Sequence, residues 1–252
     1  MSSNIWMQCG GDSELRPLRL TPWRVVESQH EVSTRKLVHS AAEQALLEQL
    51  IEGVKPPALI GEGLPYLLFT PFRYPPLRHG SRFGVHHERG IWYGAEEQRT
   101  AFAEVAYYRL LFLEGTRAAM DLVTTALTAF TVRMRTAHGI NLDAPPFDAY
   151  RDAISSPVSY VESQAIGRSM RDASVELFRF RSARDVHGGT NVGAFTPAVF
   201  HAAVPQHFQQ WHCAATTNVV EFTRAALSGV RELHVYAREQ FLVDGTLPMP
   251  GI

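Results

Sequence analysis

Cysteine is scarce in this sequence. Only Cys9 and Cys213 occur among 252 residues, which fits a reducing compartment better than a disulfide framework, although one bridge between them stays an alternative. The N-terminal "MSSNIWMQCGG" has no basic stretch followed by an apolar one, so we expect no signal peptide. No apolar run approaches the roughly 18–20 residues of a membrane helix. The sequence therefore predicts a soluble, cytoplasmic protein without a membrane partner.

An excess of charge of one sign is also missing. The sequence has 24 Lys and Arg against 25 Asp and Glu, for a formal net charge of −1. Neither a basic stripe nor a helix-turn-helix pattern stands out, so we expect no direct binding of nucleic acid. A P-loop and a G-x-G-x-x-G motif are both absent. This argues against the Walker and Rossmann modes of nucleotide binding, but not against nucleotides as ligands.

Histidine is plentiful by contrast, with eleven residues. Adjacent side chains such as His86 and His87 point to opposite sides of an extended chain, so they rarely bind the same ion. His201, His207 and His212 lack the i, i+4 spacing of a zinc-binding helix. We therefore expect no metal site. The nucleophile elbow G-x-S-x-G is absent as well, and "GSRFG" does not fit it.

The clearest early element is a helix over residues 38–53. Ser40 and Glu43 have the spacing of a capping box, and leucines and an isoleucine follow with helical periodicity. "KPP" ends this unit. We therefore expect an N-terminal helical extension over residues 1–60, packed on a main domain over residues 61–252.

The main domain reads as a mixture of strands and helices. Strands are predicted at 66–74, 90–95, 127–137, 176–183, 212–224 and 231–238, the last two as a closing pair, and helices at 97–114, 159–173 and 197–211. Residues 1–20 look irregular and weakly packed. Because the order is not a regular alternation of strand and helix, the sequence predicts an α+β fold.

A glycine-flanked arginine is the first candidate for a binding residue. Arg82 lies between Gly80 and Gly84 in "HGSRFG". Glycines let the backbone approach a ligand, and the planar guanidinium suits a phosphate group. An ordinary turn with an exposed arginine explains the same residues, and the fragment alone does not decide between the two.

A glutamate and a serine are the next candidates. Glu104 lies in an alanine-rich helical stretch, and a carboxylate on such a face is either paired, for example with Arg109, or functional. Ser182 follows a strand pattern in "FRFRSARD" and falls on the same side as Phe178 and Phe180. A serine at the end of a core strand can reach into a cleft, but it also serves as a turn or cap hydroxyl.

Together these motifs resemble the RES domain, named for an arginine, a glutamate and a serine. The matching segments are, in chain order, "PFRYPP", "GSRFG", "GIWYGA", "TAFAEVAYYR", "FRSARD" and "GGTNVGAF", over roughly residues 66–200. By this resemblance Arg82, Glu104 and Ser182 are the name-giving residues. The chain departs from the family where many members have a Gly-Arg-Trp-Asn run and where many have a Pro-Ser pair, at "SRFG" and "RSARD".

Three further residues match the family in the same way. Tyr93 corresponds to the family tyrosine, and Arg73 and Asn191 match more loosely. The resemblance implies that these three bind substrate and that Arg82, Glu104 and Ser182 are catalytic. It also implies an ADP-ribosyltransferase-like fold, in which a split, twisted β core and surrounding helices form a cleft for NAD.

The resemblance further implies an NAD-consuming enzyme. Family members release nicotinamide by hydrolysis or phosphorolysis, so NAD is the substrate and phosphate an alternative co-substrate, without a resident cofactor. Glu104 would stabilise positive charge on the ribose, Arg82 and Arg73 would bind the diphosphate, and Tyr93 would face the nicotinamide ring. Ser182 would bind the ribose or orient the carboxylate.

The family includes toxins of bacterial toxin–antitoxin modules. The resemblance thus implies a small antitoxin partner, and a homodimer is a further expectation. Two alternatives use the same fold: a mono-ADP-ribosyltransferase with a protein acceptor, and a catalytically silent binding module. The joint presence of the arginine, tyrosine, glutamate and serine argues against the silent module.

Overall fold

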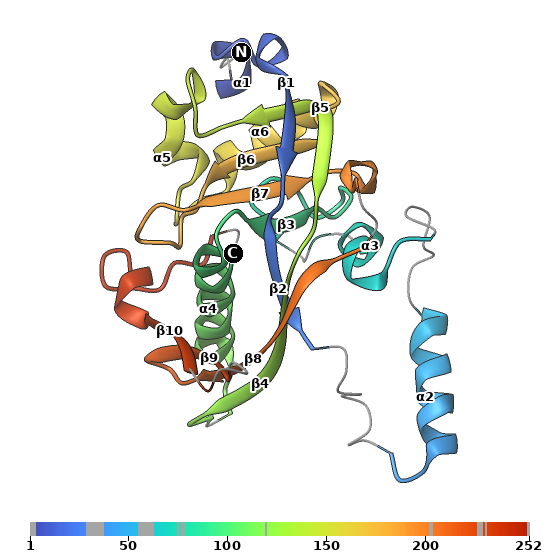
Figure 1. Ribbon diagram of the computed structural model, residues 1–252. Helices are drawn as coiled ribbons and strands as arrows, with labels where there is room; N and C mark the ends of the chain where they lie inside the picture. The colour runs from blue at the N-terminus through green and yellow to red at the C-terminus, as the bar shows by residue number, and fades with distance from the viewer. Residues whose placement is uncertain are drawn as a thin grey trace.

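The computed structural model describes residues 4–28, 38–54, 63–74, 76, 79–118, 120–201, 204–225, 229 and 231–250. Its centre is a ten-stranded mixed sheet with the strand order β1-β5-β6-β7-β3-β2-β4-β8-β9-β10 (Figure 1). Strand pairs are antiparallel except β5 and β6, which are parallel. The α+β class predicted from the sequence is confirmed.

The elements have the following bounds. The strands are β1 Arg16–Leu20, β2 Trp23–Glu27, β3 Trp92–Ala95, β4 Val123–Thr131, β5 Met134–Asn141, β6 Leu177–Arg181, β7 Thr190–Ala194, β8 Gln206–Ala215, β9 Val219–Ala225 and β10 Arg231–Ala237. The helices are α1 Ile5–Gln8, α2 Ala41–Val54, α3 Tyr66–Arg73, α4 Gln98–Gly115, α5 Arg151–Ile154 and α6 Val161–Asp172. The strands predicted at 90–95 and 176–183 and the helices predicted at 97–114 and 159–173 are thus confirmed.

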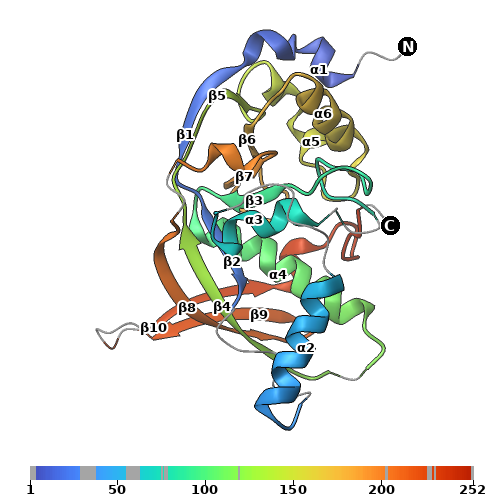
Figure 2. The same ribbon diagram turned by 90° about the vertical axis from the view of Figure 1, so that its right-hand side faces the viewer.

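Helices α4, α5 and α6 lie on the same side of the twisted sheet (Figure 2). Under α4, Phe102 packs against Trp211 and Phe222. Under α6, a second buried cluster contains Phe83 and Phe178. Helix α4 follows β3 closely in the chain, and the candidate site lies where this helix meets strands β2 and β3.

Residues Tyr66–Arg73 form helix α3, so the strand predicted at 66–74 is wrong. Leu68 and Phe72 are four residues apart and both are buried, which places them on one face of a helix. Pro71 lies in the last turn of α3, where its missing N–H removes only one intrahelical hydrogen bond. Packing of this face against the sheet decides the structure over the strand propensity of the segment.

The helix predicted over 197–211 is also wrong. A single 3-10 turn covers Pro197–Val199, and β8 begins at Gln206. The buried residues of β8 alternate, with Trp211, Cys213 and Ala215 pointing inward, which is the period of a strand. The expected strand at 212–224 is in fact the hairpin of β8 and β9, and β10 pairs with β9 as the closing strand.

The strand predicted over 127–137 is two strands. Strand β4 ends at Thr131 and β5 begins at Met134, and the two are not neighbours in the sheet. Strand β4 pairs with β2 and β8, whereas β5 pairs with β1 and β6. The break at residues 132–133 therefore carries the chain from one half of the sheet to the other.

The N-terminal segment is part of the sheet, so the expected irregular start and purely helical extension are wrong. Helix α1 buries Ile5 and Trp6, β1 pairs with β5, and β2 lies between β3 and β4. The expected domain boundary at residue 60 falls outside the described residues. The two cysteines are both buried and free, so they form no disulfide.

The helix predicted at 38–53 is confirmed as α2. Ser40 Oγ accepts the Glu43 N–H at 3.1 Å, and Glu43 Oε2 accepts the His39 N–H at 2.7 Å, so the capping box is formed. The expected packing on the main domain is not seen among the described residues. Helix α2 stands apart from the sheet (Figure 1), and Leu46 and Leu50 are 57% and 60% exposed.

None of the described helices combines the length and the apolar character needed to cross a bilayer.

Candidate active site

Glu104 is held on the cavity-facing side of α4. The opposite side of the helix is anchored by buried residues such as Phe102 and Ala106. Ala101, Glu104 and Tyr108 are spaced by three and four residues, which places them on one helical face, and all three line the same cavity. The helix therefore presents a half-buried carboxylate to a cavity while its other face packs in the core.

This cavity has a volume of about 300 Å³, at the lower end of the roughly 300–1,000 Å³ of small-molecule sites. Strands β2 and β3, helix α4 and the loop before β3 contribute its walls. The lining residues are Arg24, Val25, Ser81, Arg82, Tyr93, Gly94, Ala101, Glu104, Val105, Tyr108, Tyr160, Phe180 and Asn191. The cavity thus combines one carboxylate, two arginines and several aromatic rings.

Two hydrogen bonds fix the Glu104 carboxylate. Its Oε1 accepts from Ser182 Oγ at 2.7 Å and from Asn191 Nδ2 at 2.5 Å. Oε2 has no partner within the described part of the chain. The alternative partner Arg109 instead binds Glu27 at 2.5 Å. Glu104 is therefore oriented by neutral donors and is in no ion pair with a described residue.

Ser182 lies behind the carboxylate rather than in the cavity. It is buried and is not among the lining residues. Its Oγ accepts the N–H groups of Arg184 and Asp185, both at 3.1 Å, and donates to Glu104. Of the two roles that the resemblance implied, this geometry favours orientation of the carboxylate over contact with the ribose.

Tyr93 joins β3 to the "GSRFG" loop. Its hydroxyl lies 3.1 Å from Ser81 Oγ and accepts the Phe83 N–H at 3.2 Å. Burial raises the pKa of the Tyr93 hydroxyl to about 12, although these two hydrogen bonds oppose the shift. The phenol is therefore neutral at physiological pH, and its ring contributes to the cavity wall.

Arg82 is not the exposed turn residue that was the alternative. It is 8% exposed, and its Nη1 donates to the Ser156 carbonyl at 2.8 Å. The guanidinium also lies 4.8 Å from the centre of the Tyr160 ring. Both hydrogen bonds that Arg82 makes to described residues use Nη1, so Arg82 anchors a neighbouring loop and also lines the cavity.

Arg24 is a cavity residue that the sequence analysis missed. Its Nη1 donates to the Tyr93 carbonyl at 2.6 Å, and its guanidinium lies 5.1 Å from the centre of the Trp92 ring. Burial lowers its pKa to about 10, so it remains a cation at neutral pH. Arg73, expected to bind substrate, lies in the last turn of α3 and is absent from the cavity lining.

The sequence does contain a signal for Arg24. The family segment with an aromatic residue before an arginine was matched to "PFRYPP", but its first three residues, 71–73, end helix α3, and the strand with such a pair that reaches the cavity is "WRVVE". Tyr108 and Tyr160 were missed as wall residues too. Nothing local distinguishes them from surface tyrosines, because their partners lie far away in the sequence.

Two buried polar atoms of lining residues have no hydrogen-bond partner among the residues that the structure describes. These are Arg24 Nε, a donor, and Asn191 Oδ1, an acceptor. Buried polar groups are normally satisfied, so this pair is typical of a site that completes its hydrogen bonds with a ligand or water. Within the described ranges no group of three or more His, Cys, Asp or Glu side chains is placed to hold a metal ion.

Residues 56–216 match the family model of the RES domain. The chain belongs to the RES domain family. The RES match contains Tyr93, Arg82, Glu104, Ser182 and Asn191, which the structure gathers around one cavity, whereas β2 with its arginine precedes the matched region. No curated protein shows a significant similarity to this chain.

Proposed function

We propose that this protein cleaves NAD at the bond between nicotinamide and ribose and passes ADP-ribose to water or phosphate. RES domains are generally associated with enzymes that act on NAD. The observation that carries the proposal is the state of Glu104: a carboxylate lining a cavity, held by two neutral donors and paired with no described cation.

The chemistry of the bond explains why this state matters. Cleavage of an N-glycosidic bond builds positive charge on the ribose in an oxocarbenium-like transition state. A fixed carboxylate stabilises that charge without reorganising, and it does so more strongly in a partly dry cavity than in water. An arginine paired with Glu104 would cancel this effect. The hydrogen bonds from Ser182 and Asn191 hold Oε1 in place and leave Oε2 for the ribose.

The remaining walls suit the other parts of NAD. Arg24 and Arg82 offer guanidinium groups for the diphosphate, and the Tyr93 ring offers an aromatic face for the nicotinamide. Arg82 is buried and Arg24 is partly buried, and reduced contact with water strengthens their attraction for an anion. One carboxylate for the ribose and two cations for the diphosphate therefore match the charge pattern of the substrate.

The test is direct. Purified protein is incubated with NAD, with and without phosphate, and nicotinamide release is followed while mass spectrometry identifies the products. We expect release by the parent protein and little release by Glu104→Gln. Free ADP-ribose indicates water as acceptor, its phosphorylated form indicates phosphate, and a mass increase on protein indicates the ADP-ribosyltransferase alternative. NAD binding without release would contradict the proposal and support a silent binding module.

We extend the proposal to the biological role implied by the family, a growth-arresting toxin with a small antitoxin that covers the cavity. Expression of the parent protein in a bacterial host is expected to lower cellular NAD and stop growth, whereas Glu104→Gln is expected to do neither. Normal growth with falling NAD would contradict the toxin role, and arrest by the Glu104→Gln protein would contradict its link to NAD cleavage.

A further inference from the structure

The loop after β6 is attached to α4 at two points. Ser182 Oγ donates to Glu104 Oε1 at 2.7 Å, and three residues later Asp185 Oδ2 accepts from Thr100 Oγ1 at 2.6 Å. Thr100 and Glu104 are four residues apart on α4, so they lie on the same helical face. The two attachments therefore span one helical turn and set the position of the loop relative to the carboxylate.

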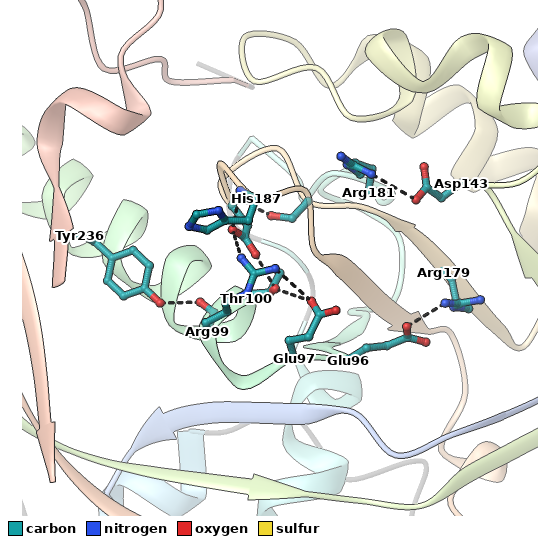
Figure 3. A network of polar contacts seen from close by, with 11 residues as sticks. Glu96, Glu97, Arg99, Thr100, Asp143, Arg179, Arg181, His187 and Tyr236 are labelled. Carbon is teal, nitrogen blue, oxygen red and sulfur yellow. Dashed lines mark hydrogen bonds and ion pairs between the residues drawn. The ribbon is translucent and has the colours of Figure 1, made fainter. Parts of the chain in front are cut away.

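The second attachment is buried and well supplied with donors. The Asp185 side chain is 4% exposed, and its Oδ1 accepts from Arg99 Nη1 at 2.6 Å and from the His187 N–H at 3.0 Å. Figure 3 shows Arg99 and Thr100 at the start of α4 beneath the loop that carries His187. A buried carboxylate is stable only with such partners, so Asp185 is held to this one arrangement.

Asp185 also takes part in directing the Ser182 hydroxyl. Ser182 Oγ accepts the N–H groups of Arg184 and Asp185, both at 3.1 Å. A serine hydroxyl has one proton and two acceptor positions. With both acceptor positions occupied by the turn, the proton is left for Glu104. A shift of Asp185 would move one of these two donors and so turn the hydroxyl away.

A glycine makes room for this arrangement. A Cβ on Gly189 would lie 2.0 Å from Thr100 Oγ1 and 2.6 Å from Asp185 Oδ2. The Gly189 carbonyl accepts the Ser182 N–H at 2.8 Å. The backbone at Gly189 thus passes directly over the contact between Thr100 and Asp185, and there is no room at residue 189 for a side chain larger than hydrogen.

We infer that Asp185 and Thr100 form a positioning pair for Glu104, acting through Ser182. Neither residue lines the cavity, so neither touches substrate there. Their contact holds the turn that directs the Ser182 proton toward the carboxylate. The inference rests on the function proposed above, because it assigns the pair a purpose in NAD cleavage.

Removal of the Thr100 hydroxyl tests the inference, with a matched control in the same chain. Thr100→Val keeps the shape of the side chain, and Thr128→Val removes a hydroxyl that is similarly buried but lies 3.0 Å from Ser28 Oγ, away from the cavity. We expect Thr100→Val to lower kcat for nicotinamide release by about 10- to 100-fold, the scale of a catalytic group displaced by up to about 1 Å. KM for NAD should stay within about twofold, since the pair makes no substrate contact. Thr128→Val should change neither constant.

Two further measurements separate positioning from general damage. Thr100→Ser restores the hydroxyl and is expected to restore kcat. In a Glu104→Gln background, Thr100→Val is expected to cause no further fall in kcat, because a residue that acts through Glu104 has nothing left to position. An equal fall in kcat for Thr100→Val and Thr128→Val, or a further fall in the double variant, would overturn the inference.

Crystal structures of both valine variants give a readout that does not depend on turnover. We expect the hydrogen bond between Ser182 and Glu104 to be lost or rotated in Thr100→Val and retained in Thr128→Val. An intact Ser182 bond in Thr100→Val would refute the positioning pair, whatever the activity. If the parent protein releases no nicotinamide, the proposed function fails, and these structures still decide whether the pair positions Glu104.

Discussion

Glu104→Gln separates the charge of this side chain from its shape. Glu104 Oε1 accepts two hydrogen bonds, and the carbonyl oxygen of glutamine can occupy the same place and accept both. The amide NH₂ then takes the position of Oε2, which has no partner among the described residues. The substitution therefore keeps the local contacts and removes the negative charge from the cavity.

The two effects have different sizes. The hydrogen bonds from Ser182 and Asn191 change from charge-assisted to neutral ones, which costs about 1–2 kcal/mol of folding stability in total. For a chain of 252 residues, each kcal/mol lowers Tm by about 2–4 °C. Loss of one electrostatic stabiliser of the transition state lowers kcat by about 10²–10³-fold. NAD affinity should change far less, because the ribosyl charge develops only in the transition state.

The assay measures kcat at saturating NAD, KM and Tm on one preparation of folded protein. Glu114→Gln is the matched control, since Glu114 lies on the same helix, is 44% exposed and pairs with Arg238 at 3.0 Å. An exposed pair of this kind contributes about 0–1 kcal/mol, so both kinetic constants should stay unchanged. Normal turnover by folded Glu104→Gln protein, or an equal loss in Glu114→Gln, would refute the catalytic assignment.

Three other predictions follow from the geometry. Arg24→Met is expected to raise KM for NAD at least about tenfold, since a hydrogen bond to a charged group contributes about 1.5–3 kcal/mol. The control Arg73→Met changes an arginine outside the cavity and should leave KM unchanged. If steady-state kinetics give Arg24→Met the same KM as the parent protein, Arg24 does not bind the diphosphate. The pKa of Tyr93 is raised to about 12 from 10.0, so folding favours its neutral form, and the free energy of unfolding should be constant below pH 10 and fall as pH rises toward 12. Tyr93→Phe should make this fall smaller when the free energy of unfolding is measured with urea at each pH. The same pH dependence in Tyr93→Phe and in the parent protein would contradict the prediction. Gly189→Ala should lower both Tm and kcat, because its Cβ would lie 2.0 Å from Thr100 Oγ1. If thermal unfolding and kinetic assays give this variant the Tm and kcat of the parent protein, the loop after β6 can shift without consequence.

Local sequence patterns were sufficient where one element determines the outcome. The capping residues Ser40 and Glu43 predicted the start of α2, and the alanine-rich stretch around Glu104 predicted helix α4. Strand β6 followed from its alternating pattern. The order of the family motifs also pointed to Tyr93, Ser182 and Asn191, although "RSARD" departs from the family pattern around Ser182 and Asn191 matches only loosely.

The sequence failed where distant contacts override local preference. Residues 66–73 have a strand-like composition, yet burial of Leu68 and Phe72 on one face makes them a helix. Residues 206–211 were expected to be helical, yet pairing with β4 makes them part of strand β8. In both cases the neighbours that decide the structure lie far along the chain, outside any local window.

The amino-acid sequence by itself determined the family and the α+β class, and by resemblance it named Glu104, Ser182 and Asn191 as site residues. The two hydrogen bonds that join Ser182 and Asn191 to Glu104 came from the tertiary structure. Only the tertiary structure placed Arg24 in the cavity, excluded Arg73 from its lining and joined Asp185 to Thr100. The physical reason is strand pairing: β2 lies between β3 and β4 although about a hundred residues separate β2 from β4 in the chain. Hydrogen bonds between such distant strands depend on the whole packed sheet, so no local pattern encodes which arginine reaches the site.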